Sequence, residues 1–251
     1  MPTRRSLPNR LYKYQPLSPQ ALDNIRNGVL WFSNPHHHFN DPFDCQAVLL
    51  DARITDQEIK DESIRVGIDN PDLAQWHLET SLWAQLLCRI WNDVSVACFS
   101  ETVDDMLMWS HYTNGHTGFC LEFDTSIAPF NDARPVIYKT AFPKLKLSTK
   151  SLKSATNEQL TNSLISRMLL TKHRGWRYER EWRVVRSEGA HTEAFDKRAI
   201  TGVYMGAKMP WQKDGELRSA VAPSEPTYNR MVRLPQRFGV SPLPFTFASG
   251  S

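Results

Sequence analysis

The chain of 251 residues has few cysteines and lacks any closely paired set of them. Its four cysteines are widely scattered, each among apolar neighbours, and no CxxC motif occurs. This spacing argues against a zinc ribbon and indicates reduced thiols packed as small hydrophobic side chains. The cysteines are Cys45, Cys88, Cys98 and Cys120.

Long apolar runs are also absent. The longest, such as residues 47–50, are far shorter than the ~20 residues that a membrane-spanning helix needs. Arg4 and Arg5 lie near the N-terminus, but the apolar segment of a signal peptide does not follow them. We therefore expect a cytoplasmic protein with no membrane partner.

Neither sign of charge dominates, because 30 Lys and Arg residues face 27 Asp and Glu residues and leave a formal net charge of +3. This near-balance does not indicate a nucleic-acid-binding protein, although a nucleic acid stays open as a substrate. The 41% hydrophobic and 23% charged fractions are typical of globular proteins and exclude wholesale disorder. The sequence contains neither a GxGxxG nor a GxxxxGK[ST] motif, so it indicates neither a Rossmann unit nor a P-loop.

Strand-like and helix-like segments interleave without a βαβα repeat. This order predicts a single α+β domain over residues 1–251, with a central mixed or antiparallel sheet flanked by helices. A two-domain alternative would place its boundary in the Lys- and Ser-rich segment 144–154. Residues 1–10 are expected to be loose, and the proline-rich residues 210–251 are expected to be mostly irregular.

Local signals predict the main elements. Ser18 is a good N-cap for a helix that Gly28 ends, and Thr55 with Glu58 forms a capping-box pair. β-Branched and aromatic content predicts four strands of the central sheet. These are residues 29–33, 94–99, 118–123 and 182–186. Residues 142–157 are expected to form a solvated loop, residues 158–172 a helix, and residues 179–186 a strand.

Two segments combine polar and aromatic residues at expected turns. In residues 39–44, a tight turn pinned by two phenylalanines would aim Asn40 or Asp41 into a cleft, although a purely structural turn is the alternative. Ser100 follows a buried strand, where a serine lines a site about as often as it caps the next helix. Both segments therefore supply candidate site residues.

A third segment, residues 108–112, places Trp109, Ser110, His111 and Tyr112 together. A flat indole beside neutral donors suits a nucleobase, a nicotinamide or a sugar. The alternative for His111 is a buried histidine whose ring is satisfied by backbone carbonyls. We expect Asn40, Asp41, Trp109, His111 and Glu181 to line one cleft.

A fourth segment, residues 176–183, would place Glu179, Glu181 and Arg183 on one face of a strand. Two carboxylates on one face repel, which is unfavourable for stability and useful for chemistry. One could stabilise a developing cation while the other handles a proton. On this interpretation Glu181→Gln abolishes activity but leaves stability unchanged or higher, whereas an ion pair with Arg183 or Arg177 predicts a loss of stability. The alternative is a solvated edge strand with alternating charge.

Three consecutive histidines, His36, His37 and His38, suggest a metal site at first sight. Consecutive side chains point in different directions on a regular backbone, and no HExxH spacing is present. No metal ligand is therefore predicted.

These segments together resemble a bacterial family known as domain of unknown function 2971. The resemblance extends from about Leu11 to Met205. It rests on residues 11–14, 30–35, 39–44, 98–101, 108–112 and 176–183.

The order of the segments is also similar to that of ADP-ribosyltransferases. Those enzymes have an early strand with a basic or histidine residue, a middle strand ending in serine, and a late strand with a catalytic glutamate. The resemblance implies that Lys13 and either Ser33 or Ser100 contact NAD. It also implies that Glu181 is the catalytic glutamate at the nicotinamide-side ribose and that Glu179 positions the acceptor.

We therefore expect an NAD-consuming enzyme, an ADP-ribosyltransferase-like toxin or phage-defence effector that acts on a nucleic acid or a protein. His111 is a further candidate catalytic residue, and Asn40, Asp41, Trp109 and Tyr112 are further candidates for binding NAD. A metal-dependent hydrolase or nuclease that uses Asp41, Asp44, His111 and Glu181 is one alternative. A non-catalytic module that senses a nucleotide is the other.

Overall fold

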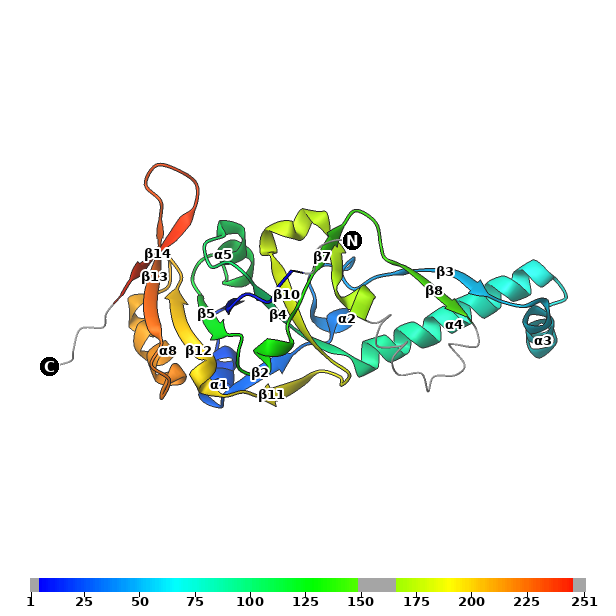
Figure 1. The fold of residues 1–251 in the computed structure, drawn as a ribbon, viewed down its shortest axis with the longest axis horizontal. Coiled ribbons are helices and arrows are strands. Elements are labelled where there is room, and N and C mark those ends of the chain that lie inside the picture. Colours follow the sequence, from blue (N-terminus) through cyan, green and yellow to red (C-terminus); the bar gives the residue numbers. More distant parts are fainter. Residues whose placement is uncertain (1–4, 149–165, 246–251) are drawn as a thin grey trace.

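The fold is built around one eight-stranded sheet. The structure, a computed structural model, describes residues 5–148 and 166–245. The strand order is β14-β13-β12-β5-β1-β4-β10-β6, with β12 and β13 parallel and the other neighbours antiparallel (Figure 1). The predicted α+β class with a mixed central sheet is confirmed. The strands are β1 (Arg10–Gln15), β4 (Ser95–Ser100), β5 (Phe119–Asp124), β6 (Arg134–Pro135), β10 (Glu181–Arg186), β12 (Ile200–Met205), β13 (Thr227–Arg233) and β14 (Val240–Pro244).

Six further strands form three two-stranded sheets. They are β2 (Val29–Phe32) with β11 (His191–Ala194), β3 (Val48–Arg53) with β8 (Lys144–Ser148), and β7 (Ile137–Lys139) with β9 (Thr171–His173). The prediction that residues 29–33 belong to the central sheet is therefore wrong. β2 takes β11 as its partner, and a single bridge between Ser33 and Val96 joins it to β4.

Two helices begin at the caps that the sequence indicates. The Ser18 side chain caps α1 (Pro19–Arg26), and the Thr55–Glu58 capping box opens α3 (Asp56–Val66). Within the described ranges, no helix combines the length and apolar character that crossing a membrane requires. The remaining α-helices are α2 (Pro35–His38), α4 (Pro71–Asp93), α5 (Met106–Tyr112) and α8 (Asp214–Val221). The 3₁₀ helices are η1 (Phe130–Asp132), η2 (Arg174–Glu179), η3 (Lys197–Ala199) and η4 (Trp211–Lys213).

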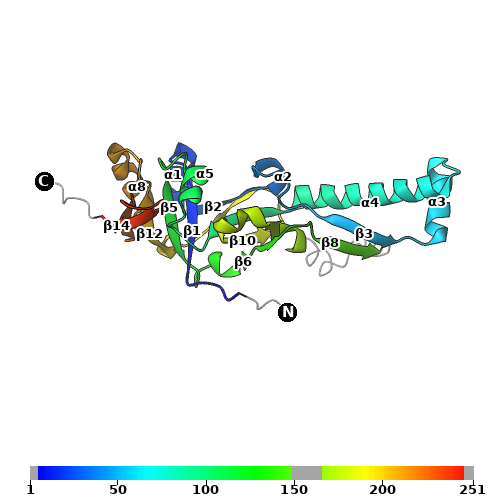
Figure 2. The ribbon, with the colours of Figure 1, turned by 90° about the horizontal axis from the view of Figure 1, so that it is seen from above.

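One end of the molecule is an arm made of α3, α4 and the β3–β8 pair, which extends away from the main sheet (Figures 1 and 2). The prediction of a loop over residues 142–157 is wrong at β8, where alternating lysine and leucine residues pair in parallel with β3. Residues 149–157 and most of the helix expected at 158–172 lie outside the described residues. Residues 166–169 are helical, and Lys172 belongs to β9.

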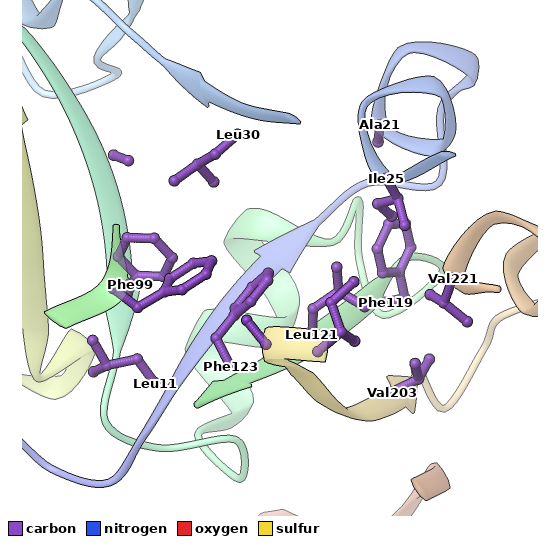
Figure 3. Close-up of a cluster of buried hydrophobic side chains, with 14 of the residues drawn as sticks. Leu11, Ala21, Ile25, Leu30, Phe99, Phe119, Leu121, Phe123, Val203 and Val221 are labelled. Atoms are coloured by element: carbon purple, nitrogen blue, oxygen red, sulfur yellow. The ribbon is translucent and has the colours of Figure 1, made fainter. Parts of the chain in front are cut away.

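The main core lies between the sheet and helices α1 and α8. Alternate strand residues such as Leu121 and Phe123 point to this face, where they meet Ile25 of α1 and Val221 of α8 (Figure 3). The rings of Phe123 and Phe130 stack with their centroids 4.3 Å apart. Burial of these apolar side chains fixes the sheet on which the site is built.

The intervening strand residues point to the opposite face, where they pack against α5. Tyr14 of β1 and Cys120 of β5 join Met108 and Trp109 of α5 in a second buried cluster. The ring of Trp109 meets that of Tyr14 edge-on, with centroids 5.2 Å apart. This packing fixes α5 against the strands.

The described parts of residues 1–10 and 210–251 are more ordered than the sequence indicates. Residues 210–245 contain α8, β13 and β14, so the prediction of a mostly irregular segment is wrong for the described part. The prolines that suggested irregularity include Pro242 and Pro244, which lie in β14 at the edge of the sheet, where a missing N–H is tolerated.

The prediction of a loose segment over residues 1–10 is also wrong where the structure describes it, from residue 5. The guanidinium of Arg5 pairs with Glu101 and lies 5.6 Å from the Trp182 ring centroid. The Thr125 hydroxyl donates to the carbonyl of Pro8.

The start of β5 provides a test of this packing. A Cβ at Gly118 would lie 2.2 Å from the carbonyl oxygen of Gln15, so Gly118→Ala is expected to cost about 1–3 kcal/mol of unfolding free energy. A Cβ at Gly215 in α8 would meet no atom within 4 Å, so the control Gly215→Ala is expected to be neutral or stabilising by up to about 1 kcal/mol. Urea denaturation measures both. Equal stability of the two variants would contradict the close approach of the β1 end to Gly118.

Candidate functional site

One cavity lies beside α5, where β1, β4 and β10 run next to one another, and has a volume of about 380 Å³. We name it the main cavity because most of the candidate site residues line it. β1 and β4 pair at Tyr12 opposite Ser100, and Ser100 in turn lies opposite Glu181 of β10. Most of the candidate site residues therefore meet here. The candidates that line the main cavity are Lys13, Ser33, Asn40, Ser100, His111, Tyr112, Glu179 and Glu181.

Two candidates do not line the main cavity. The carboxylate of Asp41 accepts from the backbone N–H of Phe43 at 2.9 Å, so this aspartate stabilises its own turn. Trp109 is fully buried, and its indole N–H donates to the carbonyl of Val103 at 2.6 Å. The expectation that both residues share the cleft with Asn40, His111 and Glu181 is therefore wrong. Trp109 is a core residue that holds α5 in place.

Glu179 and Glu181 do not lie on one strand face, as the sequence indicated. Glu179 ends η2, Arg180 adopts a left-handed conformation with φ of 45°, and β10 begins at Glu181. The turn nevertheless points both carboxylates at the same cation, the ammonium of Lys172. The sequence therefore predicted correctly that the two carboxylates lie close together, but it did not predict the turn at Arg180 that brings them together.

Five buried ionisable residues form what we name the charged cluster. Lys172 Nζ lies 2.5 Å from Glu179 Oε2, 3.1 Å from Glu181 Oε2 and 3.4 Å from Asp44 Oδ2. Arg183 binds Asp44 through two nitrogens, at 2.7 and 3.0 Å, and Glu181 through two, at 2.7 and 3.0 Å. Three carboxylates thus surround two cations. With every group ionised, the charged cluster would carry a net charge of −1.

Arg183 is fully buried at the centre of this arrangement. Besides its two carboxylate partners, its Nη1 donates to the carbonyl of Leu169 at 2.7 Å. Its guanidinium also lies 5.2 Å from the ring centroid of Phe39. These contacts satisfy a buried charge whose desolvation would otherwise be very unfavourable.

The two glutamates have opposite pKa shifts. Burial, together with the nearby charge of Glu181, raises the pKa of Glu179 to about 7. Burial also opposes the ionisation of Glu181, but the charges of Arg183 and Lys172 outweigh it and hold the pKa of Glu181 below its usual value. Near neutral pH, Glu179 can therefore gain or lose a proton while Glu181 stays ionised. Such a separation is typical of an acid–base pair.

Further polar groups complete the main cavity. The Tyr112 hydroxyl donates to Glu179 Oε1 at 2.6 Å, and burial and the charge of Glu179 raise the pKa of Tyr112, so the phenol stays protonated. The ammonium of Lys13 donates to the carbonyl of Cys98 at 3.2 Å and lies 5.2 Å from the Phe99 ring centroid. Burial lowers the pKa of Lys13. An ammonium has three N–H donors, so Lys13 can bind an anion in the main cavity.

The two candidate serines differ in accessibility. Ser100 is fully buried, and its hydroxyl donates to the carbonyl of Glu179 at 2.6 Å, which ties the end of β4 to the turn before β10. Ser33 is half-buried, and its hydroxyl donates to the carbonyl of Val96 at 3.2 Å. Ser100 therefore shapes the main cavity, while Ser33 is open to it.

Aromatic side chains form the rim. Trp31 is 40% exposed, and its ring lies edge-on to that of His38, with centroids 5.9 Å apart. His111 also lines the main cavity, with its ring centroid 6.5 Å from that of Trp176 and 6.4 Å from that of Tyr178. Flat rings that line a cavity can stack on a planar ligand.

Sequence reasoning missed Lys172 altogether. It was assigned to the end of a helix, whereas it lies in the three-residue β9 with its ammonium 5.0 Å from the Trp176 ring centroid. The one signal that could have found it is the need for a cation between Glu179 and Glu181. Asp44, named only for a metal site, instead binds Arg183.

The structure places no suitable group of metal ligands together in the histidine run and the described cysteines. His36, His37 and His38 form α2, and among the described residues no three histidine, cysteine or acidic side chains are placed to hold one ion. Cys45, Cys98 and Cys120 are free thiols, while the side chain of Cys88 lies outside the described residues.

The charged cluster also changes the expected effect of removing Glu181. Repulsion between the two glutamates is already relieved by Lys172, and Glu181 is the partner of Arg183. The expectation that Glu181→Gln leaves stability unchanged or higher is therefore replaced by the ion-pair alternative, in which the variant is less stable.

Two arginines on the same strand test the charged cluster. Arg183→Leu leaves Asp44 and Glu181 without their partner in a buried site, so we expect a loss of about 3–5 kcal/mol of unfolding free energy. Arg186 binds Glu193 and Asp132 in a partly exposed position, and Arg186→Leu is expected to cost at most about 1 kcal/mol. Urea denaturation at neutral pH compares the two. A similar small loss in both would mean that the buried ion pairs add nothing to stability.

Comparison with known proteins bears on part of the chain. No curated protein and no solved structure matches the sequence. Residues 108–184 match the family described as "Protein of unknown function (DUF2971)". The matched segment includes most of α5 and the part of the charged cluster from Lys172 to Arg183. This match agrees with the resemblance to that family seen in the sequence.

Proposed function

We propose that the chain is an NAD-consuming enzyme of the ADP-ribosyltransferase type and that the main cavity is its active site. The observation that carries the proposal is the position of Lys13, Ser100 and Glu181. They come from β1, β4 and β10, which are consecutive in the sheet, and all three line the main cavity. The resemblance to ADP-ribosyltransferases implied Lys13 on an early strand, either Ser33 or Ser100 on a middle strand, and Glu181 on a late strand.

The opposite pKa shifts support a division of labour between the two glutamates. Glu181, which stays ionised, stabilises the positive charge that develops on a ribose when its glycosidic bond breaks. Glu179, with its pKa of about 7, accepts a proton at neutral pH. Tyr112 donates to Glu179 and holds its carboxylate in place. Glu179 therefore has the role of general base in addition to its contact with the acceptor.

These roles give a balanced reaction. The bond between the nicotinamide nitrogen and ribose C1′ breaks, and its electron pair leaves with neutral nicotinamide. The ribosyl cation next to Glu181 is attacked by a hydroxyl of water or of an acceptor. The proton of that hydroxyl passes to the ionised Glu179. The ammonium of Lys13 binds the diphosphate, and the rings of Trp31 and His111, which line the main cavity, stack on the planar groups of NAD.

The metal-dependent alternative fits the site less well. Of the acidic residues expected for it, Asp41 lies outside the main cavity, and the carboxylate oxygens of Asp44 and Glu181 are already bound by Lys172 and Arg183. A divalent ion there would have to compete with two buried cations for these oxygens. A binding module without catalysis would use the same main cavity, and experiment must separate it from an enzyme.

Nicotinamide release from NAD tests the proposal. We expect the wild type to release nicotinamide, and Glu181→Gln to lower kcat by about 10²–10³-fold because the carboxylate charge is lost at the reacting carbon. The ratio kcat/KM should rise as pH increases through about 7, since Glu179 must lose its proton to act as a base, and this rise should disappear in Glu179→Gln.

Glu193→Gln is the matched control, because Glu193 also pairs with an arginine but lies outside the main cavity. It should keep wild-type activity. Thermal melts of every variant separate loss of activity from loss of fold. Binding of NAD without nicotinamide release by the wild type would favour the sensor, and full activity of a folded Glu181→Gln would refute the assignment of Glu181.

A further inference from the structure

A second, larger cavity lies on the other side of α5. It has a volume of about 1160 Å³ and runs between Met106, Leu107 and Ser110 of α5 and residues 233–240, the turn of the β13–β14 hairpin. We name it the hairpin groove. Other residues of the same helix, Met108 and His111, line the main cavity. The two cavities therefore share α5 as a common wall.

The hairpin groove carries an unusually exposed aromatic ring. Phe238 is 96% exposed at the turn of the hairpin, which projects from the end of the sheet (Figure 1). Met106 and Leu107, about two-fifths exposed, supply apolar surface across the groove. Apolar groups gathered at a groove in this way are typical of a surface that binds a partner.

The charge of the hairpin groove is positive. Arg233 and Arg237 are exposed and make no ion pair with any described residue, and no acidic residue lines the groove. Asp105, the acidic neighbour of Met106 in the chain, is occupied in capping α5, where it accepts from two backbone N–H groups at 2.8 and 3.1 Å. The two guanidinium groups are therefore available to an anionic partner.

We propose that the hairpin groove binds single-stranded nucleic acid and that this strand is the acceptor of the ADP-ribosyl group. Phe238 offers its ring face to an unpaired base, and Arg233 and Arg237 bind phosphates on either side. Proteins that bind single strands combine a positively charged groove with exposed aromatic rings in this way. The acceptor role rests on the proposed function, whereas the binding itself does not.

The position of α5 connects binding to chemistry. A strand that lies in the hairpin groove along Met106 and Ser110 needs to pass only one helix to reach His111 and Tyr112 at the main cavity. An acidic peptide would satisfy the two arginines but offers no stack of planar groups for Phe238. A duplex keeps its bases stacked inside and leaves the ring without a partner. The single strand is the partner that uses both features.

Fluorescence anisotropy with labelled single strands of about 12 nucleotides, DNA and RNA, tests the binding in the absence of NAD. Phe238→Ala is expected to weaken binding about 5–50-fold, because base stacking on the ring is lost. Arg233→Gln combined with Arg237→Gln should lower the slope of log affinity against log salt concentration by about 1.4, since two phosphate contacts are removed. These residues are exposed, so the fold is expected to be unchanged, and a thermal melt checks this.

The controls lie on α3, at the other end of the molecule (Figure 1). Ile64→Ala removes an apolar side chain that is 78% exposed, and Lys60→Gln removes an exposed charge. Both should bind as the wild type does. The proposal is overturned if the wild type fails to bind single strands at about 50 mM salt. It is equally overturned if duplexes or phosphatidylserine vesicles bind better, or if Phe238→Ala binds as well as the wild type.

The acceptor role has its own readout. With NAD labelled in its adenosine part, the wild type should transfer label to the single strand. Phe238→Ala should still release nicotinamide but transfer little label. Release of nicotinamide with no labelled oligonucleotide overturns the acceptor role alone. Binding of the oligonucleotide with no release of nicotinamide overturns the proposed enzymatic function and leaves the hairpin groove as a binding site.

Discussion

The site depends on the ion pairs that the buried guanidinium of Arg183 makes with Asp44 and Glu181. A charge without solvent must be neutralised and hydrogen-bonded, and Arg183 takes Asp44 from the segment before β3, Glu181 from its own strand and the carbonyl of Leu169. Three segments that are distant in the chain are thereby held around one planar group. Replacing any of these partners would leave the others unsatisfied, so the requirements of folding and the geometry of the main cavity cannot be separated.

The same interaction determines the chemistry. Arg183 and Lys172 hold Glu181 in its charged form, and the charge on Glu181 together with burial makes Glu179 hold its proton up to a pH of about 7. The charged cluster has three carboxylates for two cations, so one proton near neutral pH brings its net charge to zero. A reaction with a cationic transition state and a proton transfer needs one carboxylate that stays ionised and one that exchanges a proton near neutral pH. Glu181 and Glu179 supply these two carboxylates at the main cavity. The stabilising pairs and the reactive proton are two properties of one arrangement.

Local sequence signals predicted several of the helices and central strands, because caps and hydrophobic periodicity act over a few residues. The capping box at Thr55 and the strand that carries Glu181 are examples. What could not be predicted depends on contacts between distant segments. The alternation of residues 179–186 concealed the left-handed turn at Arg180, and nothing near Lys172 in the sequence shows that two glutamates will meet it. The segment around Trp109 has the composition of a ligand-binding site, and only the packing of Trp109 against Tyr14 shows that it belongs to the core.

The most direct test is a carbon-13 NMR titration of the glutamate carboxyl groups, with Glu179→Gln and Glu181→Gln used to assign the two signals. The account predicts that the Glu179 signal titrates with a midpoint near pH 7. The Glu181 signal should stay that of an ionised carboxylate throughout the pH range in which the protein is folded. Titration of both signals near the ordinary glutamate pKa of about 4.3, or a reversal of the two assignments, would contradict it.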